Sequence, residues 1–151
     1  MPIIGIREIS IILLSFSIVF AQSIEKSSNL LFDYETFSYT AKVKVLEKSE
    51  NVQIGVSGDP WLLDFGQIYV GMGSRKYINV TANDRYKVML KASGNISSFV
   101  RFEKNNFIVE KGNVAIPIYI EPKKPGFYDG EVKIVFKKVK YNFLNWLLKC
   151  V

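Results

Sequence analysis

The sequence contains no histidine and a single cysteine, Cys150, among its 151 residues. The absence of histidine excludes a histidine-based catalytic triad, an imidazole general base and a histidine metal ligand. A single cysteine excludes a disulfide within the chain and any zinc or iron–sulfur site built from several cysteines. We interpret Cys150 as a free thiol in the C-terminal tail, and a disulfide to a second chain is the alternative.

Hydrophobic residues make up 48% of the chain, which is too many for a disordered protein, and the length suits one domain. Lysine and arginine together number 20 against 14 acidic residues, so the formal net charge is +6. After Glu131 the chain has no acidic side chain but five lysines: Lys133, Lys137, Lys138, Lys140 and Lys149. Because the rest of the chain is close to neutral, we predict no nucleic-acid partner.

Residues 1–21 have the pattern of a secretory signal peptide. Arg7 precedes an apolar run from Ile9 to Phe20, and Ala21 fits a signal-peptidase site. The run is shorter than the roughly 20 residues that a membrane-spanning helix needs. We therefore predict a secreted or cell-surface protein. An uncleaved anchor that also uses residues 2–6 and a buried cytosolic helix are the alternatives.

From residue 34 to residue 136, short runs of alternating apolar and polar side chains are separated by turn residues. The first run places Phe37, Tyr39, Ala41, Val43 and Val45 on one face, as in a half-buried strand. Further strands are predicted at 51–56, 77–82, 86–91, 99–102, 106–109, 114–120 and 131–136. Short strands without an amphipathic helix predict an all-β domain, an antiparallel β-sandwich. Residues 22–33 are predicted to be a polar lead-in to it.

Several motifs follow one another between residues 60 and 136: Leu63–Gly71, Tyr77–Thr81 with Asn83, Phe107–Gly112, Ile116–Pro122 and Gly126–Gly130. Their order resembles that of immunoglobulin-like domains of the major-sperm-protein and ASH type. In these domains an Asp-Phe-Gly strand end and a Val-Gly step come before a strand and an Asn, and a Gly-Tyr-x-Gly hairpin entry comes later. The resemblance implies an immunoglobulin-like sandwich of seven to nine strands that binds macromolecules or packs in an envelope assembly. It implies no catalytic residues.

The motifs that could carry chemistry have structural interpretations. Asp64-Phe65-Gly66 matches a kinase triplet by letters only, and we interpret it as a turn after an aromatic core residue. Gly71-Met72-Gly73 lacks the following helix of a phosphate cradle, and we interpret it as a hairpin turn. The acids Asp59, Asp64, Glu103, Glu110, Glu121 and Asp129 match neither a glycosidase motif nor a calcium loop. We predict no enzyme, no cofactor and no metal.

Two features are relevant to carbohydrate. The triplets Asn79-Val80-Thr81 and Asn95-Ile96-Ser97 are candidate glycosylation sites in an exported chain. Six aromatic residues are candidates for a sugar-stacking platform: Trp61, Tyr69, Tyr77, Tyr86, Tyr119 and Tyr128. Packing in the core or on the sheet faces is the competing interpretation. A carbohydrate-binding module is therefore the alternative function.

Residues 137–151 form a basic, amphipathic tail. Lys138, Asn142, Asn145 and Lys149 have the spacing of one polar stripe on a helix. We predict that the tail contacts a membrane or a partner through Lys138, Lys140, Phe143, Leu144, Trp146, Leu147, Leu148 and Lys149. Its apolar run is too short to cross a bilayer but suits a helix in the membrane interface. Docking of this face on the sandwich is the alternative.

The main hypothesis is an exported, immunoglobulin-like module of the cell envelope or the extracellular space. We expect it to bind a protein partner, for example by adding a strand at a sheet edge, with membrane association through the tail.

Overall fold

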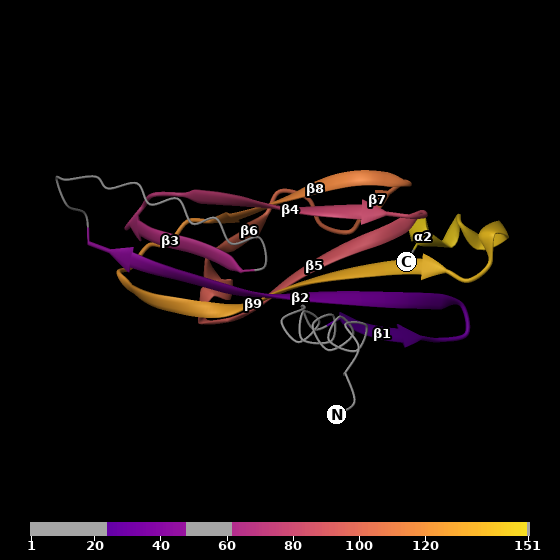
Figure 1. The fold of residues 1–151 in the computed structure, drawn as a ribbon, viewed down its shortest axis with the longest axis horizontal. Helices are drawn as coiled ribbons and strands as arrows, with labels where there is room; N and C mark the ends of the chain where they lie inside the picture. Colours follow the sequence, from indigo (N-terminus) through magenta and orange to yellow (C-terminus); the bar gives the residue numbers. More distant parts are fainter. Residues whose placement is uncertain (1–23, 48–61, 151) are drawn as a thin grey trace, which may run out of the picture.

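The computed structural model describes residues 24–47 and 62–150. The predicted signal peptide, the strand predicted at 51–56 and Trp61 lie outside these residues. Within them, nine strands form two sheets that lie face to face (Figure 1). The prediction of an all-β fold is confirmed.

The larger sheet has the order β1-β2-β9-β5-β7, and β3 also pairs with β2. Its strands are β1 (Ile24–Ser28), β2 (Phe32–Leu46), β3 (Leu63–Tyr69), β5 (Tyr86–Gly94), β7 (Phe107–Val109) and β9 (Gly126–Val139). The smaller sheet has the order β4-β8-β6, with β4 (Ser74–Ala82), β8 (Gly112–Ile120) and β6 (Val100–Phe102). All pairs are antiparallel except β2–β3, which is parallel, so the expectation of a wholly antiparallel sandwich is wrong for that pair.

Strand β2 has the predicted alternation but is longer than predicted. Tyr39, Ala41, Val43 and Val45 are buried, while Lys42 and Lys44 point the other way. β2 pairs with β9 along its whole length, from Phe32 opposite Val139 to Val45 opposite Gly126. The two strands therefore run from one end of the sandwich to the other.

The predicted polar lead-in is a strand for part of its length. Residues 24–28 form β1, which pairs with Asp33–Phe37 of β2. All five residues of β1 are exposed, so neither face of the strand is apolar enough to give the signal of a buried strand. Backbone pairing with β2, rather than side-chain burial, holds β1 in place.

Two connecting segments carry the chain between the sheets. Val70–Gly73 connects β3 of the larger sheet to β4 of the smaller one, so Gly71-Met72-Gly73 is not a hairpin turn. The residues after Ala82 take the chain back to β5 in the larger sheet. Such crossings place consecutive strands in opposite layers, as in a sandwich.

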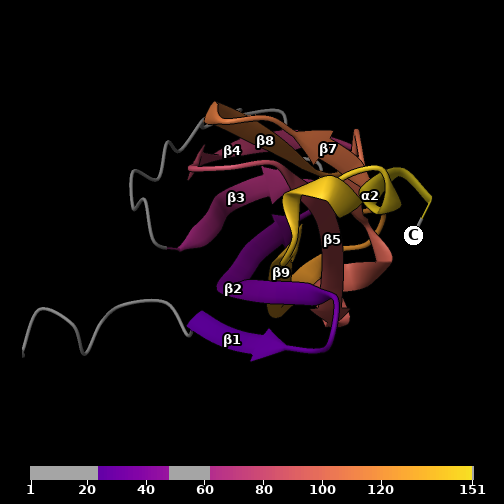
Figure 2. The ribbon, with the colours of Figure 1, turned by 90° about the vertical axis from the view of Figure 1, so that its right-hand side faces the viewer.

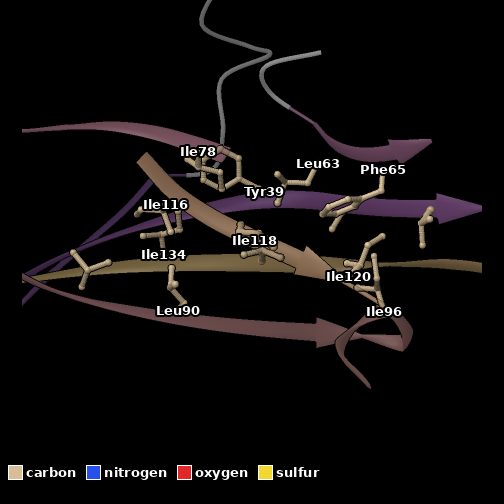
Figure 3. Close-up of a cluster of buried hydrophobic side chains, with 14 of the residues drawn as sticks. Tyr39, Leu63, Phe65, Ile78, Leu90, Ile96, Ile116, Ile118, Ile120 and Ile134 are labelled. Atoms are coloured by element: carbon tan, nitrogen blue, oxygen red, sulfur yellow. The ribbon is translucent and has the colours of Figure 1, made fainter. Parts of the chain in front are cut away.

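The core lies between the two layers and is built largely from branched aliphatic side chains (Figure 3). From the smaller sheet, Ile116, Ile118 and Ile120 of β8 point inward and are fully buried. They meet side chains of the larger sheet such as Ile134 of β9 and Leu90 of β5. This single apolar layer is the main source of the free energy that stabilises the fold.

Two glycines allow β5 and β9 to approach closely where β5 ends. Gly94 has φ +83° and lies opposite Gly130. A Cβ added at Gly94 would lie 2.6 Å from the Gly130 Cα, so neither position accepts a side chain without backbone movement. This explains the glycine that the sequence motif carries at position 130.

Candidate interaction surface at one end of the sandwich

The C-terminal tail is not the single helix that the sequence predicts. Strand β9 continues to Val139, because Lys138 and Val139 pair with Asp33 and Phe32 of β2. A short 3-10 helix, η2 (Asn142–Leu144), and one turn of α-helix, α2 (Leu147–Cys150), follow. The predicted polar stripe from Lys138 to Lys149 therefore does not form.

One half of the tail docks on the sandwich. Leu148 is fully buried, and Leu144 and Leu147 are partly buried beside it. They pack against Phe32 and Val139 on the outer face of the larger sheet, where they form a second, smaller apolar cluster. In the end-on view of Figure 2, α2 lies across the end of the sheet that carries β5 and β9.

The other half of the tail faces solvent. Tyr141, Phe143 and Trp146 are 52%, 77% and 59% exposed. The turn between β1 and β2 brings two more apolar side chains to the same end of the molecule, Leu30 at 84% and Leu31 at 38% exposed (Figure 1). We call these five residues, Leu30, Leu31, Tyr141, Phe143 and Trp146, the apolar end.

Backbone contacts join the two segments of the apolar end. The N–H of Lys140 donates to the carbonyl of Leu31 over 3.0 Å. The Asn29 side-chain oxygen accepts from the N–H of Leu31 and fixes the turn. In the tail, the rings of Tyr141 and Phe143 lie 5.9 Å apart. The exposed apolar side chains are therefore held on an ordered backbone.

Sequence reasoning found Phe143 and Trp146 but missed Leu30, Leu31 and Tyr141. The two leucines lie in the segment predicted to be a polar lead-in. Their signal was a pair of adjacent leucines directly after an Asn with the turn-forming chemistry of Asx residues. Only the pairing of β2 with β9 brings this turn to the C-terminal tail.

Acidic side chains from other segments neutralise much of the basic tail. Lys138 Nζ lies 2.6 Å from a carboxylate oxygen of Asp84, and Lys140 Nζ lies 3.9 Å from one of Asp33. The hydrogen bond between Lys138 and Asp84 raises the pKa of Lys138 and lowers the pKa of Asp84. Lys149 is exposed and forms no ion pair with an acidic side chain of the described residues.

Lys137 differs from its neighbours because its side chain is buried. The ammonium lies 3.9 Å from the centre of the Phe32 ring, in a cation–π contact. Burial lowers the pKa of Lys137, and the positive charge of Lys87 on the neighbouring strand lowers this pKa further. Lys137 belongs to the structural support beneath the tail and does not face an external partner.

The two candidate glycosylation sites differ in their surroundings. Asn79 is exposed on the outer face of β4. Asn95 begins the 3-10 helix η1 (Asn95–Ser98), and its side-chain oxygen accepts a 2.6 Å hydrogen bond from the Asp129 N–H. Asn95 therefore already has a structural role, and Asn79 is the more accessible of the two for attachment of a glycan.

The aromatic side chains do not gather into one sugar-stacking platform. Tyr77 and Tyr119 lie on the smaller sheet, and the Arg75 guanidinium lies 4.0 Å from the centre of the Tyr119 ring. Tyr86 packs edge to face against Phe136 in the core of the sandwich. The described candidates are thus distributed over separate parts of the fold.

Asp64-Phe65-Gly66 lies within strand β3, so its interpretation as a turn is wrong, and a register shift against β2 accommodates Gly66 with φ +70°. Phe65 is buried, and Asp64 accepts from the Gly66 N–H over 2.8 Å and pairs with Lys42 at 3.1 Å. Desolvation raises the pKa of Asp64, but these two contacts and the charges of Lys42 and Lys76 together lower this pKa below its usual value. In the described ranges, no three Asp, Glu or Cys residues lie close enough to share a metal ion.

In the part of the chain that the structure describes, no helix is long and apolar enough to span a bilayer. Comparison of the chain with models of known protein families, with curated proteins and with solved structures finds no match.

Proposed function

We propose that this protein is an exported, non-catalytic module that attaches peripherally to a lipid surface through the apolar end. The observation that carries the proposal is that two distant segments, joined by a backbone hydrogen bond at one end of the sandwich, expose five apolar side chains. Monomeric proteins rarely expose apolar side chains in such a group unless they bind a partner or a membrane.

The composition of the apolar end suits the interface between lipid and water. Trp146 and Tyr141 are aromatic side chains with a polar edge, which prefer the interface between lipid and water. Phe143 and Leu30 are the most exposed and would enter the acyl region. Burial of each large apolar side chain contributes about 1.5–3 kcal/mol.

An immunoglobulin-like arrangement for the remainder of the molecule is part of the proposal. In such sandwiches, strands C, F and G form one sheet opposite A, B, E and D. We assign β5 and β9 to C and F, and β4, β8 and β6 to B, E and D. In this assignment β2, from the N-terminal side of the chain, takes the place of the last strand G.

Vesicle co-sedimentation tests the attachment. We expect the protein to sediment with phosphatidylcholine vesicles. The exposed-site substitutions F143S and W146S should each weaken this binding about tenfold or more, because each removes one large inserted side chain.

The matched control is F127S. Phe127 is 64% exposed but lies where β9 begins, at the opposite end of the sandwich. If F127S loses as much binding as F143S and W146S, the binding depends on general hydrophobicity rather than on the apolar end. If the wild type does not sediment with the vesicles, the apolar end binds a protein partner instead.

A further inference from the structure

At the end of the sandwich where β9 begins, far from the apolar end, two hollows share part of their lining. Their volumes are about 400 Å³ and about 500 Å³, within the range of small-ligand sites. Arg101 of β6 and Glu121, which follows β8, line both hollows. We call this feature the basic groove.

Cationic side chains outnumber acidic ones along the basic groove. Arg101, Lys123 and Lys124 line the two hollows together with Glu103 and Glu121. None of the three cations forms an ion pair with an acidic side chain in the described part of the chain. Guanidinium and ammonium groups that converge on a concave surface favour an anionic ligand, and Arg binds carboxylates bidentately.

Aromatic rings supply the apolar surface of the groove. Phe99 and Tyr128 line the first hollow and pack edge to face with ring centres 4.7 Å apart. Tyr119 lines the second hollow, but the Arg75 guanidinium covers one face of its ring. Two carboxylates in the same groove add acceptors for hydroxyl groups.

The loop that carries the two lysines is anchored at both ends. The Glu121 N–H donates to the Phe99 carbonyl over 3.2 Å, and the Gly71 N–H donates to the Pro122 carbonyl over 3.0 Å. The Tyr128 hydroxyl donates to the Lys124 carbonyl over 3.2 Å. Because the loop backbone is already fixed, little conformational entropy is lost when a ligand binds.

We propose that the basic groove binds an acidic oligosaccharide. Carboxylate or sulfate groups of the sugar pair with Arg101, Lys123 and Lys124. Ring hydroxyls donate to Glu103 and Glu121, and the apolar faces of the sugar rings contact the aromatic side chains. A small inorganic anion would use only the cations and would leave the two carboxylates without hydroxyl donors. This site is independent of lipid attachment.

Calorimetric titration tests the proposal with oligogalacturonate, oligoguluronate and heparin-derived oligosaccharides as acidic probes, a maltooligosaccharide as the neutral probe, and inorganic phosphate. We expect at least one acidic probe to bind and the neutral probe not to bind. R101Q and the double variant K123Q/K124Q should each weaken that binding about tenfold or more. The double variant K91Q/K111Q removes the same charge elsewhere and should keep full affinity.

Three results would overturn the proposal. The first is that no acidic probe binds more tightly than the neutral probe. The second is that K91Q/K111Q weakens binding as much as the groove variants do. The third is that phosphate displaces the oligosaccharide at equal concentration. The variant F143S/W146S should retain oligosaccharide binding, which separates this site from the proposed lipid attachment.

Discussion

At the scale of single residues, Lys137 is the side chain whose position is least expected from its chemistry. A lysine rarely lies fully buried without an acidic partner. Here the Phe32 ring, rather than a carboxylate, faces the ammonium. Because burial and Lys87 both lower the pKa of Lys137, the folded state binds this proton less tightly than the unfolded chain does.

The first prediction concerns the substitution K137M. At pH 7 it should raise the free energy of unfolding by about 1 kcal/mol, because it removes a buried charge and retains an apolar stem. As the pH rises through the lowered pKa of Lys137 toward its unfolded value of 10.5, the wild type loses the buried charge and gains stability. The difference between the two proteins should therefore shrink toward pH 10.5.

Chemical denaturation at several pH values measures this effect. The variant K87M, which removes the neighbouring charge and leaves Lys137 in place, should give a smaller gain in the free energy of unfolding. A K137M protein that is less stable than the wild type at pH 7 would mean that the cation–π contact with Phe32 outweighs the cost of burial.

At the scale of elements, the tail shows what the periodicity of the sequence can predict and what it cannot. The apolar residues of 143–148 were found from the sequence, but a helical period from Lys138 was not realised. Backbone pairing with β2 extends β9 by three residues beyond Phe136 and leaves too little chain for a long helix. The pairing of β9 depends on β2, which lies about a hundred residues earlier in the sequence, and a local sequence pattern cannot predict such a distant partner.

The strand interiors were predictable for the opposite reason. Tyr39, Ala41, Val43 and Val45 alternate with polar residues, so burial alone fixes which face turns inward. β1 has no buried side chain and gave no such signal.

The apolar end was only half predicted, because its Leu30 and Leu31 are isolated in a polar segment and reach the tail only when β2 pairs with β9. The basic groove combines β6 with the loop before β9, and neither segment has a motif of its own.

The second prediction separates the two halves of the tail. L148A should lower the free energy of unfolding by about 2–3 kcal/mol, because Leu148 is fully buried against Phe32 and Val139. F143A should change it by less than about 0.5 kcal/mol, because Phe143 is 77% exposed. Denaturant unfolding of both variants measures the difference, and similar values for the two would contradict the docking of α2.

At the scale of the whole molecule, the two proposed surfaces lie at opposite ends of the long axis. β9 begins beside the loop of the basic groove and ends beside the apolar end, and β2 spans the same length in the opposite direction (Figure 1). Attachment to a membrane by the apolar end would therefore turn the basic groove away from the lipid, toward ligands outside. The rigid sandwich acts as a spacer between two binding surfaces in this arrangement.

The third prediction concerns the charge of the lipid. Five lysines follow Glu131 in the sequence, and each would contribute about 1 kcal/mol on an anionic membrane if it were free. In the structure, Lys138 and Lys140 have acidic partners and Lys137 is buried, which leaves Lys149 as the main contribution from residues 137–150. Phosphatidylglycerol in the vesicles should therefore strengthen binding by less than about tenfold.

The double variant D33N/D84N should increase this preference for anionic vesicles, because it frees Lys140 and Lys138 from their partners. E47Q/E103Q removes two negative charges elsewhere and serves as the control. Co-sedimentation with neutral and anionic vesicles at low and high salt measures the preference. A gain of a thousandfold or more on anionic vesicles for the wild type would mean that all five lysines act on the lipid, and that electrostatic attraction rather than insertion of the apolar end drives attachment.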